Sequence, residues 1–307
     1  MTDPIGVLVM AYGGPSCLED VEPYLLDVRG HRPTPADLVE EVRRRYAAIG
    51  GSSPILERTR AQANALAAAL RGNSPPFQVT VGMRHWHPYI SAALADLARD
   101  GVRRAVGIVM APHYSRLSIG AYYRRVEEAQ NGIEIAGIES WHLAPGYVRA
   151  VASRVTAAVN RLPEALRLEA PVVFTAHSLP ESILSWNDPY PRQLRETVSA
   201  VVAELGPCPW HFAYQSAAKT PDRWLGPDVG ETLDTLARGG ARAVVVAPVG
   251  FVSEHVEILY DLDCELAGHA TGLGVRLERI EMLNDDPGLM KELARLVHQT
   301  AGKAGWL

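Results

Sequence analysis

The sequence has few cysteines and lacks the common glycine-rich phosphate motifs. Its three cysteines, Cys17, Cys208 and Cys264, are far apart among 307 residues. They form no CxxC zinc pattern and fall short of the four ligands of a typical iron–sulfur cluster. We therefore expect reduced thiols, as in a cytoplasmic protein. Neither GxGxxG after the first apolar run nor GxxxxGK[ST] anywhere is present, which argues against NAD or ATP as a ligand.

Long apolar runs and an excess of positive charge are missing too. The first residues, MTDPIGVLVMAYGG, carry no basic region, and their apolar stretch soon ends at glycine, so we expect a strand and not a signal peptide. No run approaches the ~20 apolar residues that cross a bilayer. The formal charge of −5 argues against nucleic acid as a partner. The expected location is the cytoplasm, with no integral membrane segment.

Composition and apolar patterning indicate an ordinary globular protein of about two domains, since domains average roughly 150 residues. Hydrophobic residues make up 47% and charged residues 21% of the chain. Short apolar, β-branched runs are expected to be strands at residues 6–11, 77–82, 104–111, 133–140, 171–176, 211–215, 242–248 and 275–282. Helical periodicity is clearest at residues 56–70, 90–97, 148–159, 194–205 and 289–297.

The alternation of strands and helices predicts an α/β fold. Most of the strand runs are almost continuously apolar, as in parallel sheets that are covered on both faces. Eight strands over this length fit two sheets of four. We therefore predict two similar Rossmann-like lobes, residues 1–150 and 151–307, each a four-stranded parallel sheet flanked by helices, with a cleft between them.

Histidines gather where the predicted strands end. Ligands of open α/β sheets bind beyond the carboxyl ends of the strands. Six of the ten histidines fall at or just past such ends: His85, His87, His113, His142, His177 and His255. A single strand-end histidine is more often a structural hydrogen-bonding residue. Six of them favour a site that handles metal or protons.

A row of carboxylates follows the seventh predicted strand. In SEHVEILYDLDCE, Ser253 is a candidate N-cap, and Glu257, Asp261 and Glu265 are spaced by four, on one helical face. Most such rows are solvated surfaces. This one starts directly after a strand and lacks interleaved lysine or arginine, and oxygen ligands suit hydrated divalent cations. Together with His177, the row predicts a metal path that ends at a nitrogen base.

Seven longer motifs resemble those of one enzyme family. They are VMAYGGP (9–15), RRYAAIGGSSP (44–54), APHYS (111–115), TAHSLPESI (175–183), DPYPRQL (188–194), YQSAAKTPDRWLGPDV (214–229) and PVGFVSEHVEILYDLDCE (248–265). Together they are similar to the ferrochelatases, from about residue 6 to the last predicted helix. The short chain is most similar to the soluble bacterial coproporphyrin ferrochelatases.

The resemblance implies a lyase of heme biosynthesis that inserts Fe²⁺ into a porphyrin bound in the cleft and releases two protons. His177 and Glu257 correspond to the catalytic and metal-binding pair, and we expect them to face each other. Asp261 and Glu265 correspond to an acidic line that holds metal, with room for a second divalent cation such as Mg²⁺. Beyond its substrate Fe²⁺ the enzyme is expected to need no cofactor, to carry no iron–sulfur cluster, and to be a monomer.

The resemblance also assigns porphyrin contacts. Tyr12 is expected near the metal position. Contacts to the ring or its propionates are implied for Tyr12, Arg29, Arg45, Tyr46, Ser53 and Tyr122.

The sequence leaves several alternatives open. Coproporphyrin III is the favoured substrate, followed by protoporphyrin IX. A cobalt chelatase of a sirohydrochlorin-type ring and a non-catalytic porphyrin carrier are further candidates. A metal enters only after the ring bends and two pyrrole protons leave. A histidine, with an ordinary pKa near ~6.5, suits the role of proton acceptor. Whether His177 accepts protons or binds iron is undecided.

Overall fold

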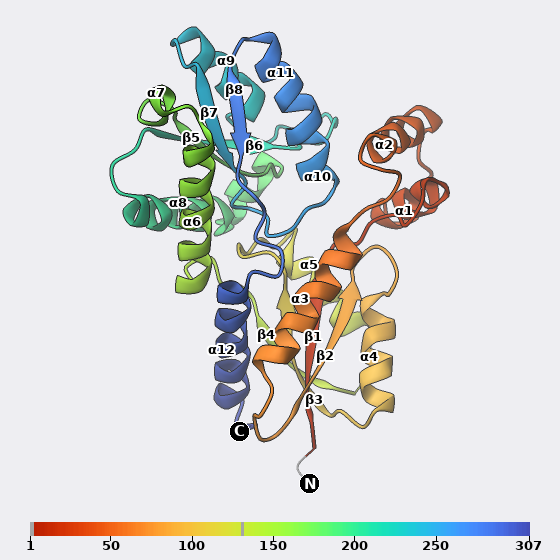
Figure 1. The fold of residues 1–307 in the computed structure, drawn as a ribbon. Helices are drawn as coiled ribbons and strands as arrows, with labels where there is room; N and C mark the ends of the chain where they lie inside the picture. Colours follow the sequence, from red (N-terminus) through yellow and green to blue (C-terminus); the bar gives the residue numbers. More distant parts are fainter. Residues whose placement is uncertain (1–2, 130–131) are drawn as a thin grey trace. The chain divides into compact units, whose positions relative to one another are not determined.

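The computed structural model describes residues 3–129 and 132–307 (Figure 1). The chain forms two compact units. The first contains the chain up to Trp141 together with Ser253–Val256 and Asn284–Leu307, and the second contains His142–Val252 and Glu257–Leu283. Each unit holds one four-stranded parallel sheet with flanking helices. The predicted fold class, two α/β units with four parallel strands each, is therefore confirmed.

The sheet of the first unit has the strand order β2-β1-β3-β4. Its strands are β1 (Ile5–Ala11), β2 (Phe77–Met83), β3 (Arg104–Val109) and β4 (Glu134–Ile138). Its helices are η1 (Leu18–Asp20), α1 (Val21–Val28), α2 (Ala36–Ala48), α3 (Ile55–Ala69), α4 (Ile90–Arg99), α5 (Ile119–Glu128) and α12 (Pro287–Lys303). Every residue of β1 is buried, because β1 lies between β2 and β3 and helices cover it. This explains why the first apolar run shows no alternation.

The C-terminal helix α12 packs on α3, β3 and β4 of the first unit (Figure 1). Its apolar face, which includes Leu289, Leu293 and Val297, is fully buried. The lobes predicted as residues 1–150 and 151–307 therefore have different boundaries from the compact units. The chain passes from the first unit to the second at Trp141, and residues 284–307 return to the first. Helical periodicity shows that α12 has an apolar face but not which sheet that face covers.

The sheet of the second unit has the strand order β6-β5-β7-β8. Its strands are β5 (Val172–His177), β6 (Trp210–Gln215), β7 (Ala243–Ala247) and β8 (Arg276–Arg279). The surrounding helices are α6 (Pro145–Arg161), α7 (Glu164–Arg167), η2 (Glu181–Trp186), α8 (Tyr190–Leu205), α9 (Val229–Arg238), α10 (Val256–Leu259), the π-helical segment η3 (Asp261–Leu266) and α11 (Ala267–Gly272). All eight predicted strands are thus confirmed, and no end differs from the prediction by more than three residues.

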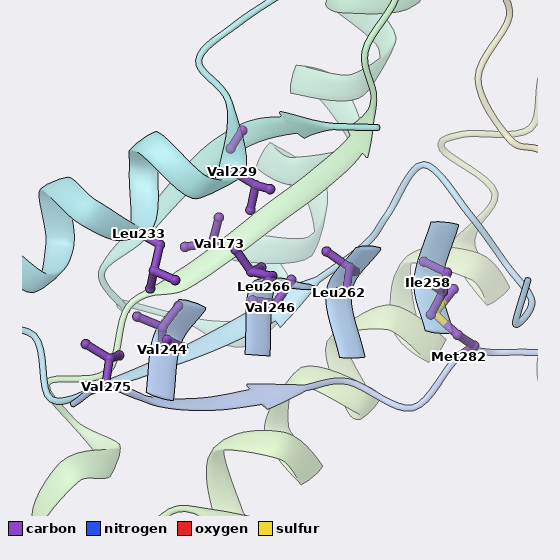
Figure 2. Packing of buried hydrophobic residues seen from close by; sticks show 12 residues of the cluster. Val173, Val229, Leu233, Val244, Val246, Ile258, Leu262, Leu266, Val275 and Met282 are labelled. Atoms are coloured by element: carbon purple, nitrogen blue, oxygen red, sulfur yellow. The ribbon is translucent and has the colours of Figure 1, made fainter. Parts of the chain in front are cut away.

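The apolar side of the acidic helical segment forms part of the second unit's core (Figure 2). Ile258, Leu262 and Leu266 are buried and belong to one cluster with Val244 and Val246 of β7. These three side chains each follow one member of the carboxylate row by one residue. Their burial fixes the rotation of the segment, so the carboxylates at 257, 261 and 265 lie on a different side from this core.

Within residues 3–129 and 132–307, no helix combines the length and the apolar character needed to cross a membrane.

Candidate active site

His177 is the last residue of β5, a central strand with β6 on one side and β7 on the other. Its Nδ1 is hydrogen-bonded to the carbonyl oxygen of Ser178. Because a carbonyl oxygen only accepts, Nδ1 carries the hydrogen, and Nε2 of the neutral ring keeps its lone pair. The hydroxyl of Tyr190 donates to the backbone oxygen of His177 at 3.0 Å. The ring is thus oriented through Nδ1 and its main chain, leaving Nε2 for chemistry.

Nε2 of His177 lies 3.5 Å from Oε1 of Glu257. The two side chains are 31% and 30% exposed, so solutes can reach both. The structure therefore brings together the two residues that the sequence placed at the centre of the site. A carboxylate at this distance stabilises a positive charge on the imidazole.

A buried glutamine links Glu257 to β5. Gln215, the last residue of β6, is 1% exposed. Its Nε2 donates to the carbonyl oxygen of Glu257 at 2.8 Å, and its Oε1 accepts from the hydroxyl of Thr175 at 2.7 Å. Thr175 precedes His177 by two residues on the same strand. The sequence showed Gln215 at a strand end, but no sequence signal indicated this bridging role.

The loop after β7 approaches β5 closely at Gly250. A Cβ on Gly250 would lie 2.8 Å from the Cα and 2.7 Å from the Cβ of Ala176, and the Gly250 amide donates to the Thr175 carbonyl at 3.1 Å. Glycine is required here because a backbone atom occupies the space of a side chain. The loop that leads toward Glu257 is thereby held against the strand that carries His177.

The acidic helical segment differs locally from the prediction. The sequence suggested Ser253 as the N-cap of this helix. Helix α10 begins at Val256, so Ser253 lies too far upstream to be its N-cap. The segment becomes a π-helix from Asp261, and the amide of Glu265 donates to the carbonyl of Tyr260 five residues earlier at 2.9 Å. Such π segments are frequent at functional sites. A spacing of four still leaves the carboxylates on neighbouring parts of the surface.

The carboxylates become more accessible along the row. Glu257 and Asp261 are partly buried, and Glu265 is exposed. Asp261 Oδ2 accepts a 2.5 Å hydrogen bond from the hydroxyl of Ser216, a residue with a left-handed backbone (φ 59°). Asp263 does not share the spacing of this row, and Arg279 donates to both its oxygens, at 2.6 and 2.8 Å.

The four predicted metal ligands do not form a closed cage. Among the residues that the structure describes, no three His, Cys, Asp or Glu side chains gather as a metal-holding group. His177 and Glu257 form a pair, while Asp261 and Glu265 follow it along the helical segment.

Tyr12 stands directly after β1 in the first unit and is 38% exposed. Its ring centroid lies 4.6 Å from that of His85, and the Arg84 guanidinium lies 5.8 Å from the Tyr12 ring centre. Nδ1 of the buried His85 lies 2.7 Å from Asp27 Oδ1. Burial lowers the pKa of His85 to about 4, although the hydrogen bond with Asp27 opposes this shift. His85 therefore supports the Tyr12 ring as a neutral residue.

Four of the remaining predicted porphyrin contacts lie around α1 and α2. Arg29 caps α1, and its buried Nε has no hydrogen-bond partner in residues 3–129 and 132–307. Arg45 is held by Glu41 at 3.0 Å. Tyr46 is buried in an apolar cluster. Ser53 lies so close to Gly14 that a Cβ there would be 2.6 Å away.

Tyr122 is also a core residue, packed in the cluster between the first sheet, α4 and α5. Its ring centre lies 5.5 Å from the guanidinium of Arg84, which also faces Tyr12. The two buried tyrosines, Tyr46 and Tyr122, thus differ from the accessible Tyr12.

Three of the six strand-end histidines each have a local partner. His85 contacts Asp27, His142 Nε2 lies 2.8 Å from Glu196, and Nδ1 of His255 lies 3.0 Å from the Ser253 carbonyl. A structural hydrogen-bonding role thus fits these three histidines. His177 is partly exposed, and its ring lies next to the carboxylate of Glu257.

Two solved chelatase structures share this fold. SirB from Bacillus subtilis with Fe³⁺ superposes with a TM-score of 0.58 at 13% identity, covering 98% of this chain and 97% of that one. CbiX, the terminal enzyme for siroheme biosynthesis in denitrifying bacteria, gives a TM-score of 0.52 at 13% identity, covering 96% and 98%. The fold is that of the metal chelatases.

The sequence specifies the family. The Ferrochelatase family model matches residues 4–301, and the chain belongs to the ferrochelatase family. A ferrochelatase of Herpetosiphon aurantiacus is 41% identical over 97% of this chain and 99% of its own length. A coproporphyrin III ferrochelatase of Bacillus subtilis is 39% identical over 97% and 98%. The predicted resemblance is confirmed, and the protein is an enzyme of metal insertion into a porphyrin in heme synthesis.

Proposed function

We propose that this enzyme inserts Fe²⁺ into coproporphyrin III, with His177 as the proton acceptor and Glu257 as its partner. The observation that carries the proposal is the accessible pair at 3.5 Å at the end of a central strand. Relatives named coproporphyrin III ferrochelatase match nearly the whole chain at 38–39% identity, alongside relatives named ferrochelatase without a stated porphyrin. The relatives named for coproporphyrin III support the choice of this porphyrin over protoporphyrin IX.

The proposed chemistry follows from the hydrogen bonding of His177. The free porphyrin holds two protons on its pyrrole nitrogens, and both must leave when Fe²⁺ enters. Nδ1 of His177 is occupied by the Ser178 carbonyl, so Nε2 is the atom that accepts a pyrrole proton. Glu257 then faces the imidazolium and stabilises its charge. Each proton passes on to solvent from this partly exposed pair before the next is taken.

We further propose that Fe²⁺ approaches along the carboxylate row. Exposed Glu265 meets the hydrated cation first, Asp261 next, and Glu257 delivers it beside His177. Carboxylates bind hydrated divalent cations through oxygen and release them readily when no cage closes around them. The same two outer carboxylates, Asp261 and Glu265, fit a second cation such as Mg²⁺. The Ser216 hydroxyl orients Asp261 in either case.

The porphyrin contacts are proposed from the first unit. Tyr12 offers an accessible ring, and Arg29, Arg45 and Ser53 offer donors for carboxylates. Tyr46 and Tyr122, which are buried, would shape the binding surface from beneath. Coproporphyrin III has four carboxylates and protoporphyrin IX has two, and the preference for the former rests on the named relatives and not on a count of these donors.

The test is anaerobic turnover with Fe²⁺ and each porphyrin, followed by absorbance of the metalloporphyrin. The proposal predicts many turnovers, and a kcat/KM for coproporphyrin III at least about 10-fold higher than for protoporphyrin IX. That ratio corresponds to about 1.4 kcal/mol of transition-state stabilisation. A preference for protoporphyrin IX would overturn the substrate assignment. Binding with a single stoichiometric conversion would indicate a carrier, and activity only with Co²⁺ and sirohydrochlorin would indicate the other chelatase.

A further inference from the structure

A polar cluster on α3 connects two distant segments of the chain. It comprises Arg58 and Gln62 of α3 together with Glu254 and Asn284, and we call it the α3 clamp. Arg58 and Gln62 are four residues apart and therefore share one helical face. Glu254 and Asn284 belong to the two late segments, Ser253–Val256 and Asn284–Leu307, that rejoin the first unit.

The clamp contains a partly buried ion pair. Nε of Arg58 lies 3.3 Å from Oε2 of Glu254, whose side chain is only 17% exposed. Both of these atoms are buried, and neither makes a hydrogen bond of good geometry within the part of the chain that the structure describes. A buried carboxylate oxygen is costly without a nearby positive charge. The guanidinium of Arg58 therefore determines where Glu254 is held.

Asn284 joins the two segments to each other. Its side-chain oxygen accepts from the Glu254 amide at 3.3 Å, and its carbonyl accepts from Nε2 of Gln62 at 3.0 Å. Gln62 is 1% exposed, and Asn284 has a left-handed backbone with φ 46°. Asparagine tolerates that conformation better than most residues. Glu254 is thus held at two points, its carboxylate by the charge of Arg58 and its amide by the side chain of Asn284.

The tied segment leads directly into the active site. Glu254 precedes Glu257 by three residues, and α10 starts at Val256, whose side chain packs with Val21, Val39 and Tyr46. A shift of Glu254 moves the first turn of α10 and with it the carboxylate that faces His177. Displacements of about 1 Å in a catalytic group can lower rates by ~10²-fold.

We propose that Arg58 is a positioning residue for metal insertion, acting through Glu254 on the placement of Glu257. The proposal rests on the proposed role of Glu257. Arg58 itself does not touch the reacting atoms. Its loss lowers kcat without changing the KM for porphyrin.

The experiment compares Arg58→Met, Arg58→Lys and a matched control, Arg60→Met, on the same helix. Arg60 is exposed, with no ion pair or hydrogen bond among the described residues. Arg58→Met, which keeps a long side chain without charge, should lower kcat about 10-fold. Arg58→Lys should recover most of it, and Arg60→Met should match the wild type.

A double-mutant cycle with Glu257→Gln separates positioning from a general loss of stability. If Arg58 acts through Glu257, Arg58→Met should change the rate of the Glu257→Gln enzyme less than 2-fold. If Arg58→Met still lowers kcat 10-fold in the Glu257→Gln enzyme, the proposal is overturned. It is also overturned if Arg58→Met alone keeps full activity while Glu257→Gln alone is slow. Full activity of Glu257→Gln would instead overturn the catalytic assignment, and the positioning role with it.

Discussion

The side chain of Gln215 donates a 2.8 Å hydrogen bond to the backbone carbonyl of Glu257. Gln215 also accepts from Thr175 on the strand that ends at His177. Glu257 is therefore held through its main chain, and this hydrogen bond does not occupy its carboxylate. The placement of His177 next to Glu257 thus depends on Gln215, which bonds the Glu257 main chain and Thr175 but not the imidazole or the carboxylate.

Replacing Gln215 with leucine should both destabilise the fold and slow turnover. The change leaves the Thr175 hydroxyl and the Glu257 carbonyl without their partner, at a cost of about 1–3 kcal/mol. Urea denaturation and kcat measure the two effects. Gln78→Leu is the control, because Gln78 bonds Asp100 at the surface and its loss should change stability by no more than ~0.5 kcal/mol. Equal effects in the two variants would contradict the bridging role.

Replacing His177 with alanine should reduce kcat by at least ~10²-fold, because the pyrrole protons lose their acceptor. Porphyrin binding, followed by fluorescence, should be nearly unchanged. His269→Ala is the matched histidine variant, since His269 is exposed and pairs with Asp234 on a neighbouring helix. Near-normal turnover of His177→Ala would rule out this residue as the base.

Removing both outer carboxylates, in Asp261→Ala with Glu265→Ala, should raise the KM for Fe²⁺ about 10-fold with little change in KM for porphyrin. The physical reason is the loss of two oxygen ligands on the approach to Glu257. Asp263→Ala is the control on the same segment, because Asp263 is bound by Arg279. That control should affect stability and not the KM for metal. A higher KM for porphyrin in the double variant would refute the metal path.

The substitution Gly250→Ala should destabilise the second unit by about 1–3 kcal/mol, because the added Cβ would overlap the backbone of Ala176. Gly268→Ala in α11 is the contrasting variant. No atom lies within 4 Å of its added Cβ, and alanine favours a helix by about 1 kcal/mol over glycine. The midpoint temperature of thermal unfolding should therefore fall in Gly250→Ala and rise in Gly268→Ala. The same sign in both would argue against the close approach.

The buried His85 should make stability dependent on pH on the acid side. Burial lowers its folded pKa from 6.5 to about 4, so between these values the unfolded chain binds a proton that the folded chain does not. The free energy of unfolding therefore falls as pH drops from 6.5 toward 4 and is unaffected by this group above 6.5. In His85→Gln, urea titrations at pH 8 and pH 5 should differ less than in the wild type. An equal or larger difference would show that Asp27 keeps His85 protonated.

Much of the fold was predictable because its signals are local. Continuous apolar runs such as residues 6–11 gave β1, since buried parallel strands need apolar residues on both faces. Periodicity gave α3 and α6 within three residues at each end, whereas the range 289–297 predicted for α12 stopped six residues short of its end at Lys303. Short helices such as α7, with too few turns for a period, were not separable from loops by pattern alone. The π-helical geometry after Asp261 has no sequence pattern that would have indicated it.

The sequence by itself determined the two-sheet α/β class, the family, and His177 and Glu257 as candidate residues, because these follow from residue types and short spacings. Only the tertiary structure decided the 3.5 Å approach of that pair, the bridge through Gln215, and the return of α12 to the first sheet. Each of these joins residues far apart in the chain. Their positions depend on which apolar faces meet and which buried polar groups find partners, and no local pattern encodes that choice.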